Sequence, residues 1–479
     1  MSTPRPTRRT KIVCTIGPAT SSQAAIARLA RAGMDVARLN FSYGAHAEHA
    51  RTIARIRAVS HQLDRPIGIL QDLAGPKLRI GQLPDHGLQL DPGQEIVLST
   101  APSAPPSHIP LPWPQLPAAL SPGQRLLLAD GKIELHVLRT TNQEIHCRVR
   151  FGGLLHSHNG LALPDSALPI PTVTRKDLAD LRFGLAHQVD WVAMSFVRSP
   201  DDLLPLRRAI KRASRQAARS TALMAKIETH EATGHLQSII SAADGIMVAR
   251  GDLGVELPLD RVPLLQKAII SQCNRAGKPV ITATQMLETM VASPRPTRAE
   301  VSDIANAVLD GTDAVMLSAE TATGRYPTEA VRIMARVTAR VEAAFDFPAR
   351  LAESSQWPCH TLTDAISQAT CNLAHDLAAK AIITATTSGH TALMVAKHRP
   401  QNPIVAVTPH VATLRRLTLA WGVHPLLGPR GRNSDELILN AIARAKEAGF
   451  VQQGDIVVIT AGVPVGVPGT TNMMKVMFA

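Results

Sequence analysis

Three residues near the middle of the chain have the types and spacing of a site for a metal ion and an anion. Lys226 and Glu228 lie two positions apart at the end of the apolar run ALMAKIE, so in a strand both side chains point to the same face. The next apolar run leads into VARGDLG, which adds Asp252 and the backbone amides of Gly251 and Asp252. Mg²⁺ prefers one or two carboxylates plus substrate oxygens, and a lysine can stabilise charge that develops in a reaction. The structural alternative is a buried salt bridge between Lys226 and Glu228.

Polar residues also end other apolar runs. Thr284 and Ser318 follow two of them, where a hydroxyl can bind a carboxylate or relay a proton through water, although such residues are often simple caps. An arginine at such an end suits phosphate, because its planar fork matches the phosphate oxygens. The second and third runs carry four further candidates: Arg38, Asn40, Ser42 and Asp72.

The elements that must position these residues alternate in type along the chain. Short apolar runs read as strands buried on both faces, and amphipathic stretches between them read as helices. Eight such units favour an α/β fold of the (β/α)₈ TIM-barrel class, although an open doubly wound sheet has the same local signals. The predicted strands are 11–17, 36–42, 67–73, 191–197, 222–228, 245–250, 280–284 and 314–318; the predicted helices are 22–32, 45–62, 175–187, 201–217, 260–275 and 300–309.

Two regions depart from this rhythm. Residues 75–172 contain prolines, glycines and short β-like runs, which predicts a small inserted β domain of the β-barrel type. Because it follows the third strand, it would stand at the active-site face of the barrel and act as a lid. A new series of βα units after residue 345 predicts a C-terminal α/β domain. The predicted domains are therefore 1–74 with 173–345 (barrel), 75–172 (lid) and 346–479 (regulatory domain).

In the C-terminal domain, TTSGHT at 386–391 falls between a strand and a helix. Its hydroxyls and the amides at the helix start would form a phosphate pocket, and the Gly-rich run 461–472 could close over it. Two ordinary βα turns are the alternative.

The overall composition narrows the class of protein. Five scattered cysteines without a CxxC pair indicate free thiols in a reducing compartment. The N-terminus lacks the apolar core of a signal peptide, and no apolar stretch is long enough to span a membrane, so we expect a cytoplasmic protein without a membrane partner. The net charge of +13 is spread among acids along the helices, which favours a generally basic surface over a nucleic-acid site.

The motifs around these residues resemble those of the pyruvate kinase family, of the bacterial type. The likeness runs from about residue 8 to the C-terminus and follows the family's order. The matching stretches are TKIVCTIGPAT, MDVARLNFSYG, KIE, VARGDLGVELP, CNRAGKPVITATQMLETM, PRPTRAEVSDIANAVLDGTDAVMLSAETATGRYP and PGTTN.

The resemblance implies transfer of the phosphoryl group of phosphoenolpyruvate to ADP, giving pyruvate and ATP in the last step of glycolysis (EC 2.7.1.40). Arg38 and Lys226 would bind the phosphate, and Gly251, Asp252 and Thr284 the carboxylate. Glu228 and Asp252 would hold Mg²⁺, with Mn²⁺ as an alternative. Lys226 and the metal would stabilise the enolate, and a water relay through Thr284 and Ser318 would protonate it. The resemblance also implies nucleotide contacts from Arg79, Asn40 and Tyr43, and a homotetramer.

One departure from the family concerns potassium. Many members bind this ion with residues that match Asn40, Ser42, Asp72 and the carbonyl of Leu73, but they have glutamate where this chain has Lys77 and threonine in place of Leu73. At ~4 Å two like charges cost about 4 kcal/mol at an effective dielectric near ~20. Lys77 is therefore predicted to replace the ion, and activity is expected without added potassium. A solvated lysine with the ion still bound is the alternative.

Other departures affect the nucleotide and the effector. Tyr43 replaces the family's usual histidine, and His158 and Asn159 replace a lysine pair, so the preferred nucleoside diphosphate stays open. The TTSGHT loop resembles the family's allosteric phosphate site, which predicts a phosphorylated effector whose identity the sequence does not give. The chosen effector residues are Thr386, Ser388, Gly389 and Thr391.

Two other functions compete with this reading. A carbon–carbon lyase on the same barrel would use Lys226 as a Schiff base, but Glu228 and Asp252 speak against it, since that mechanism needs no metal. A metabolite sensor or RNA-binding protein on the same fold would not need the intact set of catalytic residues.

Overall fold

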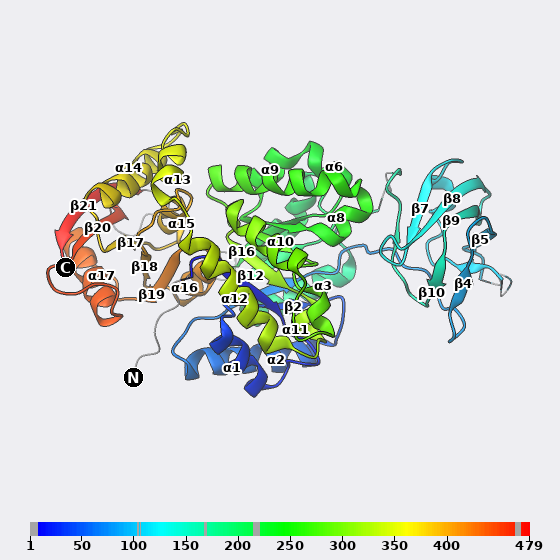
Figure 1. Ribbon diagram of the computed structural model, residues 1–479, viewed down its shortest axis with the longest axis horizontal. Helices are drawn as coiled ribbons and strands as arrows, with labels where there is room; N and C mark the ends of the chain where they lie inside the picture. Colours follow the sequence, from blue (N-terminus) through cyan, green and yellow to red (C-terminus); the bar gives the residue numbers. More distant parts are fainter. Residues whose placement is uncertain (1–7, 103–104, 106, 167–169, 214–220, 465–470) are drawn as a thin grey trace.

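The computed structural model describes residues 8–102, 105, 107–166, 170–213, 221–464 and 471–479. Parts of the predicted helix 201–217 and of the Gly-rich run 461–472 lie outside these ranges. The chain forms three bodies in a row, with a closed barrel between a small β body and a C-terminal α/β body (Figure 1). In the part of the chain so described, no helix is long and apolar enough to cross a membrane.

Eight parallel strands close into the predicted TIM barrel. β1 pairs with both β2 and β16, so the sheet has no open edge and the alternative of an open doubly wound sheet is wrong. The strands are apolar on both faces because one face fills the barrel and the other packs on helices. They are β1 (Lys11–Thr15), β2 (Val36–Asn40), β3 (Gly68–Asp72), β12 (Trp191–Met194), β13 (Ala222–Ile227), β14 (Gly245–Ala249), β15 (Val280–Ala283) and β16 (Ala314–Leu317).

The barrel helices begin where side chains can accept their free amides. Ser22 accepts from the Ala25 amide, and Thr174 and Thr297 form capping boxes with acids three residues on. Helices α6 to α8 and α11 to α13 were not among the predicted helices. The described helices are α1 (Gln23–Ala32), α2 (His46–Gln62), α3 (Arg175–Ala186), α4 (Leu204–Ala213), α6 (His230–Gly234), α7 (Leu236–Ala242), α8 (Arg250–Glu256), α9 (Val262–Arg275), α10 (Arg298–Leu309), α11 (Ala319–Ala322), α12 (Pro327–Ala343) and α13 (Phe347–Ser354).

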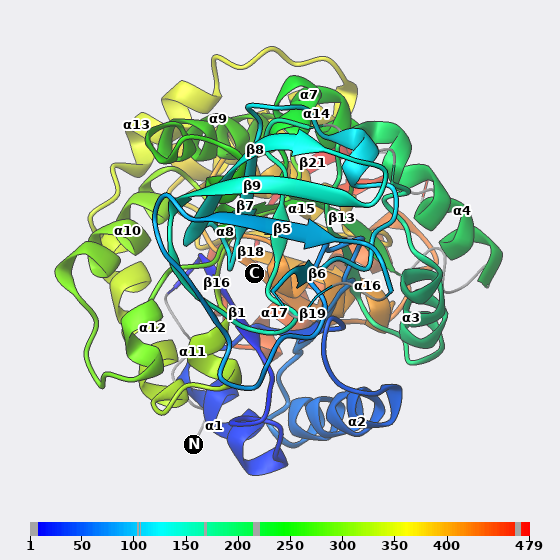
Figure 2. The same cartoon turned by 90° about the vertical axis from the view of Figure 1, so that its right-hand side faces the viewer.

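The insert after β3 is built from short strands around its own apolar core. Its strands form a six-stranded sheet and a two-stranded sheet, and Figure 2 shows β5, β8 and β9 crossing in front of the barrel. They are β4 (Leu88–Leu90), β5 (Glu95–Ser99), β6 (Ile109–Pro110), β7 (Arg125–Leu128), β8 (Ile133–Thr140), β9 (Glu144–Phe151), β10 (Gly153–Leu155) and β11 (Leu161–Ala162).

The C-terminal body is a five-stranded sheet of order β19-β18-β17-β20-β21, in which only β21 is antiparallel. Two apolar clusters cover its two faces, one with α14 and α15 and the other with α17. The elements are α14 (Leu362–Asp376), β17 (Ala381–Ala385), α15 (His390–Ala396), β18 (Ile404–Thr408), α16 (Val411–Arg416), β19 (Val423–Leu427), α17 (Ser434–Glu447), β20 (Ile456–Gly462) and β21 (Thr471–Phe478).

The insert and the C-terminal body lie at opposite ends of the barrel. Arg399 pairs with Asp313, the residue before β16, at 2.9 Å, and the Lys11 ammonium at the start of β1 donates to the carbonyl of Val423. Both contacts involve N-terminal strand ends, whereas the insert leaves from the C-terminal end of β3. The barrel therefore has a covered N-terminal face and an active-site face under the insert.

Candidate functional site

An ion-pair network occupies the C-terminal mouth of the barrel. Lys226 Nζ lies 2.7 Å from Glu228 Oε1 and 3.3 Å from Asp72 Oδ1, and it donates to Ser195 Oγ at 2.8 Å. Arg38 pairs with the other oxygen of Asp72 at 2.7 Å. The salt bridge between Lys226 and Glu228 thus exists, but it is one part of a chain of charges rather than an isolated pair.

Burial and the neighbouring charges set the protonation of this network. Burial raises the pKa of Glu228 to about 7, although Lys226 opposes the shift. Burial alone would lower the pKa of Lys226, but Asp72 and Glu228 outweigh it and the pKa rises. For Asp72, burial is likewise outweighed, by Lys226 and Arg38, and its pKa falls below the ordinary value. Lys226 therefore stays protonated, which makes it a poor nucleophile and disfavours the Schiff-base alternative.

Four cations and three carboxylates line one cavity beside this network, counted over the described residues. Such a lining has a net positive charge and suits a phosphorylated anion with a metal ion. The cavity brings together most of the residues predicted for the phosphate, the metal, the nucleotide and the monovalent cation: Arg38, Asn40, Ser42, Tyr43, Asp72, Leu73, Lys77, Arg79, Lys226, Glu228 and Asp252.

Lys77 reaches into this cavity from the beginning of the insert. Its ammonium lies 3.6 Å from Asp252 Oδ1 and 3.6 Å from Asp130 Oδ1. Asp72 Oδ1, in contrast, is buried without a hydrogen-bond donor in the described structure, apart from the longer ion pair with Lys226. The lysine therefore contacts a predicted Mg²⁺ ligand directly, a contact that its sequence position did not predict.

Glu228 and Asp252 are suited to a hard cation. Glu228 Oε1 is buried and pairs with the Lys226 ammonium at 2.7 Å, while Oε2 accepts from the Phe196 amide at 2.8 Å. Asp252 lies in the first turn of α8, at the end of the neighbouring strand. One oriented carboxylate and a second at the adjacent strand end match the ligands that Mg²⁺ uses.

Thr284 lies against Gly251, as the predicted carboxylate site requires. Its hydroxyl accepts from the Gly251 amide at 2.8 Å and donates to the Ala283 carbonyl. The Gly251 amide is therefore already hydrogen-bonded within the protein, because the strand end at 284 approaches it closely. A substrate carboxylate would have to share or replace this contact.

Ser318 is held at the next strand end by Glu320. The Glu320 carboxylate, itself 1% exposed, accepts from the amides of Ser318 and Leu287. Burial raises its pKa. The Ser318 hydroxyl is buried and has no partner in the described part of the protein, so it is available to a water or a substrate.

Several residues of the site were missed from the sequence. Ser195 links Lys226 to the Leu73 carbonyl, and Phe196 orients Glu228 through its amide. Both lie inside the predicted strand run 191–197 and directly after the observed strand β12, so their position near a strand end was the available signal. Arg250 and Glu320 also lie at or near the ends of predicted runs, but the sequence did not predict their contacts, which reach residues more than 30 positions away.

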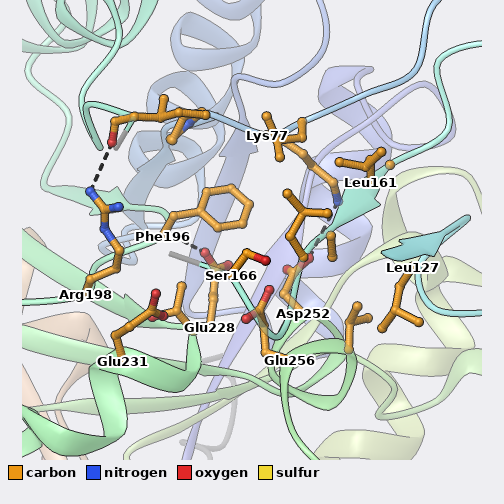
Figure 3. A pocket seen from close by; sticks show the side chains of 18 of the residues that line it. Lys77, Leu127, Leu161, Ser166, Phe196, Arg198, Glu228, Glu231, Asp252 and Glu256 are labelled. Carbon is orange, nitrogen blue, oxygen red and sulfur yellow. Dashed lines mark hydrogen bonds and ion pairs between the residues drawn. The ribbon is translucent and has the colours of Figure 1, made fainter. Parts of the chain in front are cut away.

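A second cavity extends from Lys77, Glu228 and Asp252 beneath the insert (Figure 3). Its insert side is apolar, with Leu127 and Leu161, and its barrel side carries Glu231 and Glu256. Burial, followed by the charges of Glu231 and Asp252, raises the pKa of Glu256 to about 7. The acidic residues thus extend beyond the predicted metal ligands.

The predicted effector loop lies between β17 and α15. Thr386 Oγ1 accepts from the Gly389 amide at 2.9 Å, and Thr391 Oγ1 lies 2.7 Å from Thr471 Oγ1. The half-buried Arg416 donates to the Ser388 carbonyl, and the Arg416 carbonyl in turn accepts from the indole of Trp191 in barrel strand β12. The loop is therefore internally bonded and connected to the barrel.

Comparison with known protein families gives two matches. Residues 7–331 match the profile described as "Pyruvate kinase, barrel domain", and residues 364–477 match "Pyruvate kinase, alpha/beta domain".

Full-length relatives agree with the profiles. The chain is 43% identical to "Pyruvate kinase" of Clostridium acetobutylicum, over 98% of this chain and 99% of the relative. It is 46% identical to "Pyruvate kinase" of Geobacillus stearothermophilus, over 98% of this chain and 80% of the relative. It is 48% identical to "Pyruvate kinase 2" of Synechocystis sp., over 98% of this chain and 79% of the relative.

Proposed function

The chain belongs to the pyruvate kinase family and is a phosphotransferase of that class (EC 2.7.1.40), and we propose that the cavity at the barrel mouth is where it transfers a phosphoryl group from phosphoenolpyruvate to ADP. The observation that carries this proposal is the Lys226 ammonium within ion-pair distance of Glu228 and Asp72, next to Asp252 at the adjacent strand end.

Phosphoenolpyruvate would bind between the cations and the α8 turn. Arg38 and Lys226 bind its phosphate, and Thr284 with the amides of Gly251 and Asp252 binds its carboxylate. Arg38 is well placed because Asp72 and Thr15 hold its guanidinium from two sides. Its position is therefore set before the substrate arrives, which reduces the entropy cost of productive binding.

Mg²⁺, or Mn²⁺ in its place, would be held by Glu228 and Asp252. When bound, the ion neutralises charge on the phosphoryl group and on the enolate oxygen. The bound ion would also favour the ionised form of Glu228, which burial in the protein disfavours by raising its pKa. Lys226, kept protonated by its acidic neighbours, stabilises the enolate from another side.

The enolate of pyruvate must take up a proton at carbon three. We assign the relay to water held by Thr284 and Ser318. The buried, unpartnered Ser318 hydroxyl supports this role, since a buried polar group without a partner is a natural site for an ordered water.

The nucleotide would enter on the Arg79, Asn40 and Tyr43 side. Arg79 and His158, whose carbonyl accepts from Arg79, both belong to the insert, so binding on this side would depend on the position of the insert. Tyr43 is 66% exposed and offers its ring to a base. Closure of the insert as a lid over the phosphates is part of this proposal.

Further features complete the proposal. We propose activity without potassium through Lys77, a homotetramer, and a cytoplasmic location consistent with the five free cysteines. We also propose regulation by a phosphorylated metabolite at Thr386, Ser388, Gly389 and Thr391. The domain boundaries at 74/75, 172/173 and 345/346 remain predictions.

A coupled assay for pyruvate tests the function. Purified protein with phosphoenolpyruvate, ADP and Mg²⁺ should form pyruvate and ATP in equal amounts. Lys226→Met should lose at least ~10³-fold in kcat, because it removes charge stabilisation at the reacting atoms. Lys267→Met, at an exposed lysine that pairs with Asp310, is the matched control and should keep full activity. Full activity in Lys226→Met would contradict the assignment.

A further inference from the structure

The chain makes an unusual turn where β15 ends. Thr284 and Gln285 have φ angles of +69° and +55°, in the left-handed region. A β-branched residue such as threonine is disfavoured there, because its side chain crowds the backbone. Such a conformation persists only when surrounding contacts hold it, and these conformations gather at functional sites.

Arg250 supplies the contacts that hold this turn. Its guanidinium donates to the carbonyl of Thr284 at 2.6 Å, to that of Ala283 at 3.3 Å and to that of Gln285 at 3.4 Å. Three successive carbonyls at the turn thus share one donor group. The planar fork of arginine can serve all three, whereas a lysine ammonium presents its protons around a single point.

The guanidinium is itself anchored from the opposite side. Asp303 of α10 accepts from Arg250 at 2.6 Å, and Gln266 of α9 lies at 3.4 Å. The Arg250 side chain is only 10% exposed. Its place in the loop is therefore determined by two helices whose residues are absent from the linings of the two cavities at the barrel mouth.

Residues 250–251 also hold Thr284 through a backbone hydrogen bond. The amide of Gly251, the residue after Arg250, donates to the Thr284 hydroxyl at 2.8 Å. Side chain and main chain of residues 250–251 thus fix both the carbonyl and the hydroxyl of one residue. Asp252, the proposed metal ligand, is the next residue in the chain. The hydrogen bond from Gly251 to Thr284 therefore also fixes the loop after β14 relative to the loop after β15.

We propose that Arg250 is a positioning residue for proton transfer: it keeps the Thr284 hydroxyl where the relay to carbon three needs it. This inference rests on the proposed role of Thr284. Arg250 itself does not touch the substrate, and it acts by holding a strained threonine in place.

The test is the exchange of the carbon-three protons of pyruvate with deuterium. The enzyme, with Mg²⁺ and ATP, removes a proton from pyruvate to form the enolate and returns a deuteron from D₂O, which proton NMR follows. Arg250→Met should lose about 100-fold in exchange and in kcat, the effect expected of a misplaced catalytic group. The KM for phosphoenolpyruvate should change less than kcat.

Arg207→Met is the matched control. Arg207 also joins a carboxylate, Asp244, to a carbonyl, that of Ala242, at 2.7 Å each, but it does so just before the N-terminal end of β14. This variant should keep exchange and kcat unchanged. Arg250→Lys should keep the ion pair with Asp303, but its exchange rate and kcat should exceed those of Arg250→Met by less than tenfold, since lysine lacks the planar guanidinium that serves three carbonyls.

A double variant separates positioning from general damage. Arg250→Met combined with Thr284→Ala should be no slower in exchange than Thr284→Ala alone, because both act on one step. Asp303→Asn, which removes only the anchor, should lose about tenfold in the same step if Arg250→Met does not fold. Losses that multiply, or unchanged exchange in the Arg250 or Asp303 variants, would overturn the proposal. An inactive wild-type enzyme would instead overturn the proposed function itself.

Discussion

Exchanging Lys77 for glutamate should make the enzyme depend on potassium. The lysine places a fixed positive charge in the cavity lined by Asn40, Ser42 and Asp72, which the family uses for the ion. Lys77→Glu changes this charge by two elementary units, so it removes the repulsion of a potassium ion and places a carboxylate beside the ion instead. Lys77→Gln, which only removes the charge, should behave between the two.

The size of the effect follows from Coulomb's law. A potassium ion ~4 Å from the ammonium would be disfavoured by about 4 kcal/mol at an effective dielectric near ~20. The lysine side chain is 32% exposed and is shared between Asp130 and Asp252, so we take roughly half of that value. About 2 kcal/mol still corresponds to roughly 30-fold weaker binding of the ion.

The assay compares kcat in potassium chloride with kcat in tetramethylammonium chloride at equal ionic strength. The wild-type protein should have equal activity in both salts, and Lys77→Glu should be activated at least tenfold by potassium. Lys132→Glu, also in the insert but absent from the cavity lining, is the control for surface charge. A wild-type enzyme that loses most of its activity in tetramethylammonium would refute the reasoning.

Three further predictions concern protonation, stability and regulation. The pKa of Glu256 is raised from 4.5 to about 7, so its ionisation destabilises the folded protein; this destabilisation is absent below pH 4.5 and develops as the pH rises to about 7. Glu256→Gln should therefore raise the Tm of the metal-free protein at pH 8 and leave it unchanged at pH 4. An equal rise in Tm at both pH values would contradict this. Arg399→Met leaves the buried carboxylate of Asp313 without its ion-pair partner between the barrel and the C-terminal body, and urea unfolding should show that the free energy of unfolding falls by about 3–5 kcal/mol. A fall below about 1 kcal/mol would contradict this and would mean that water compensates the charge. Ser388→Asp places a negative charge in the proposed effector loop and should abolish the shift that phosphorylated metabolites cause in the phosphoenolpyruvate saturation curve; a silent variant together with no active metabolite would show that the loop is ordinary structure.

Much of the barrel could be predicted because its signals are local. Each barrel strand is a short run buried on both faces, and all eight predicted runs are strands. Helices such as α8 and α11 were missed because they are only seven and four residues long and directly follow a strand end, where the sequence pattern is that of a loop. Closure of the sheet was left open by the pattern, since it depends on the pairing of β1 with β16, more than 300 residues apart.

The sequence by itself determined which types of reactive side chain are present and at which end of the barrel strands they lie. Lys226 lies at the C-terminal end of a parallel strand, and Glu228, Asp252 and Thr284 lie just after such ends, which necessarily meet at one face of a barrel. Only the tertiary structure decided how these groups engage each other. The contact of Lys77 with Asp252, the hold of Arg250 on Thr284 and the bridging of two loops by Glu320 all join segments that are distant in the chain. Such contacts depend on side-chain distances of a few ångströms, which strand periodicity cannot specify.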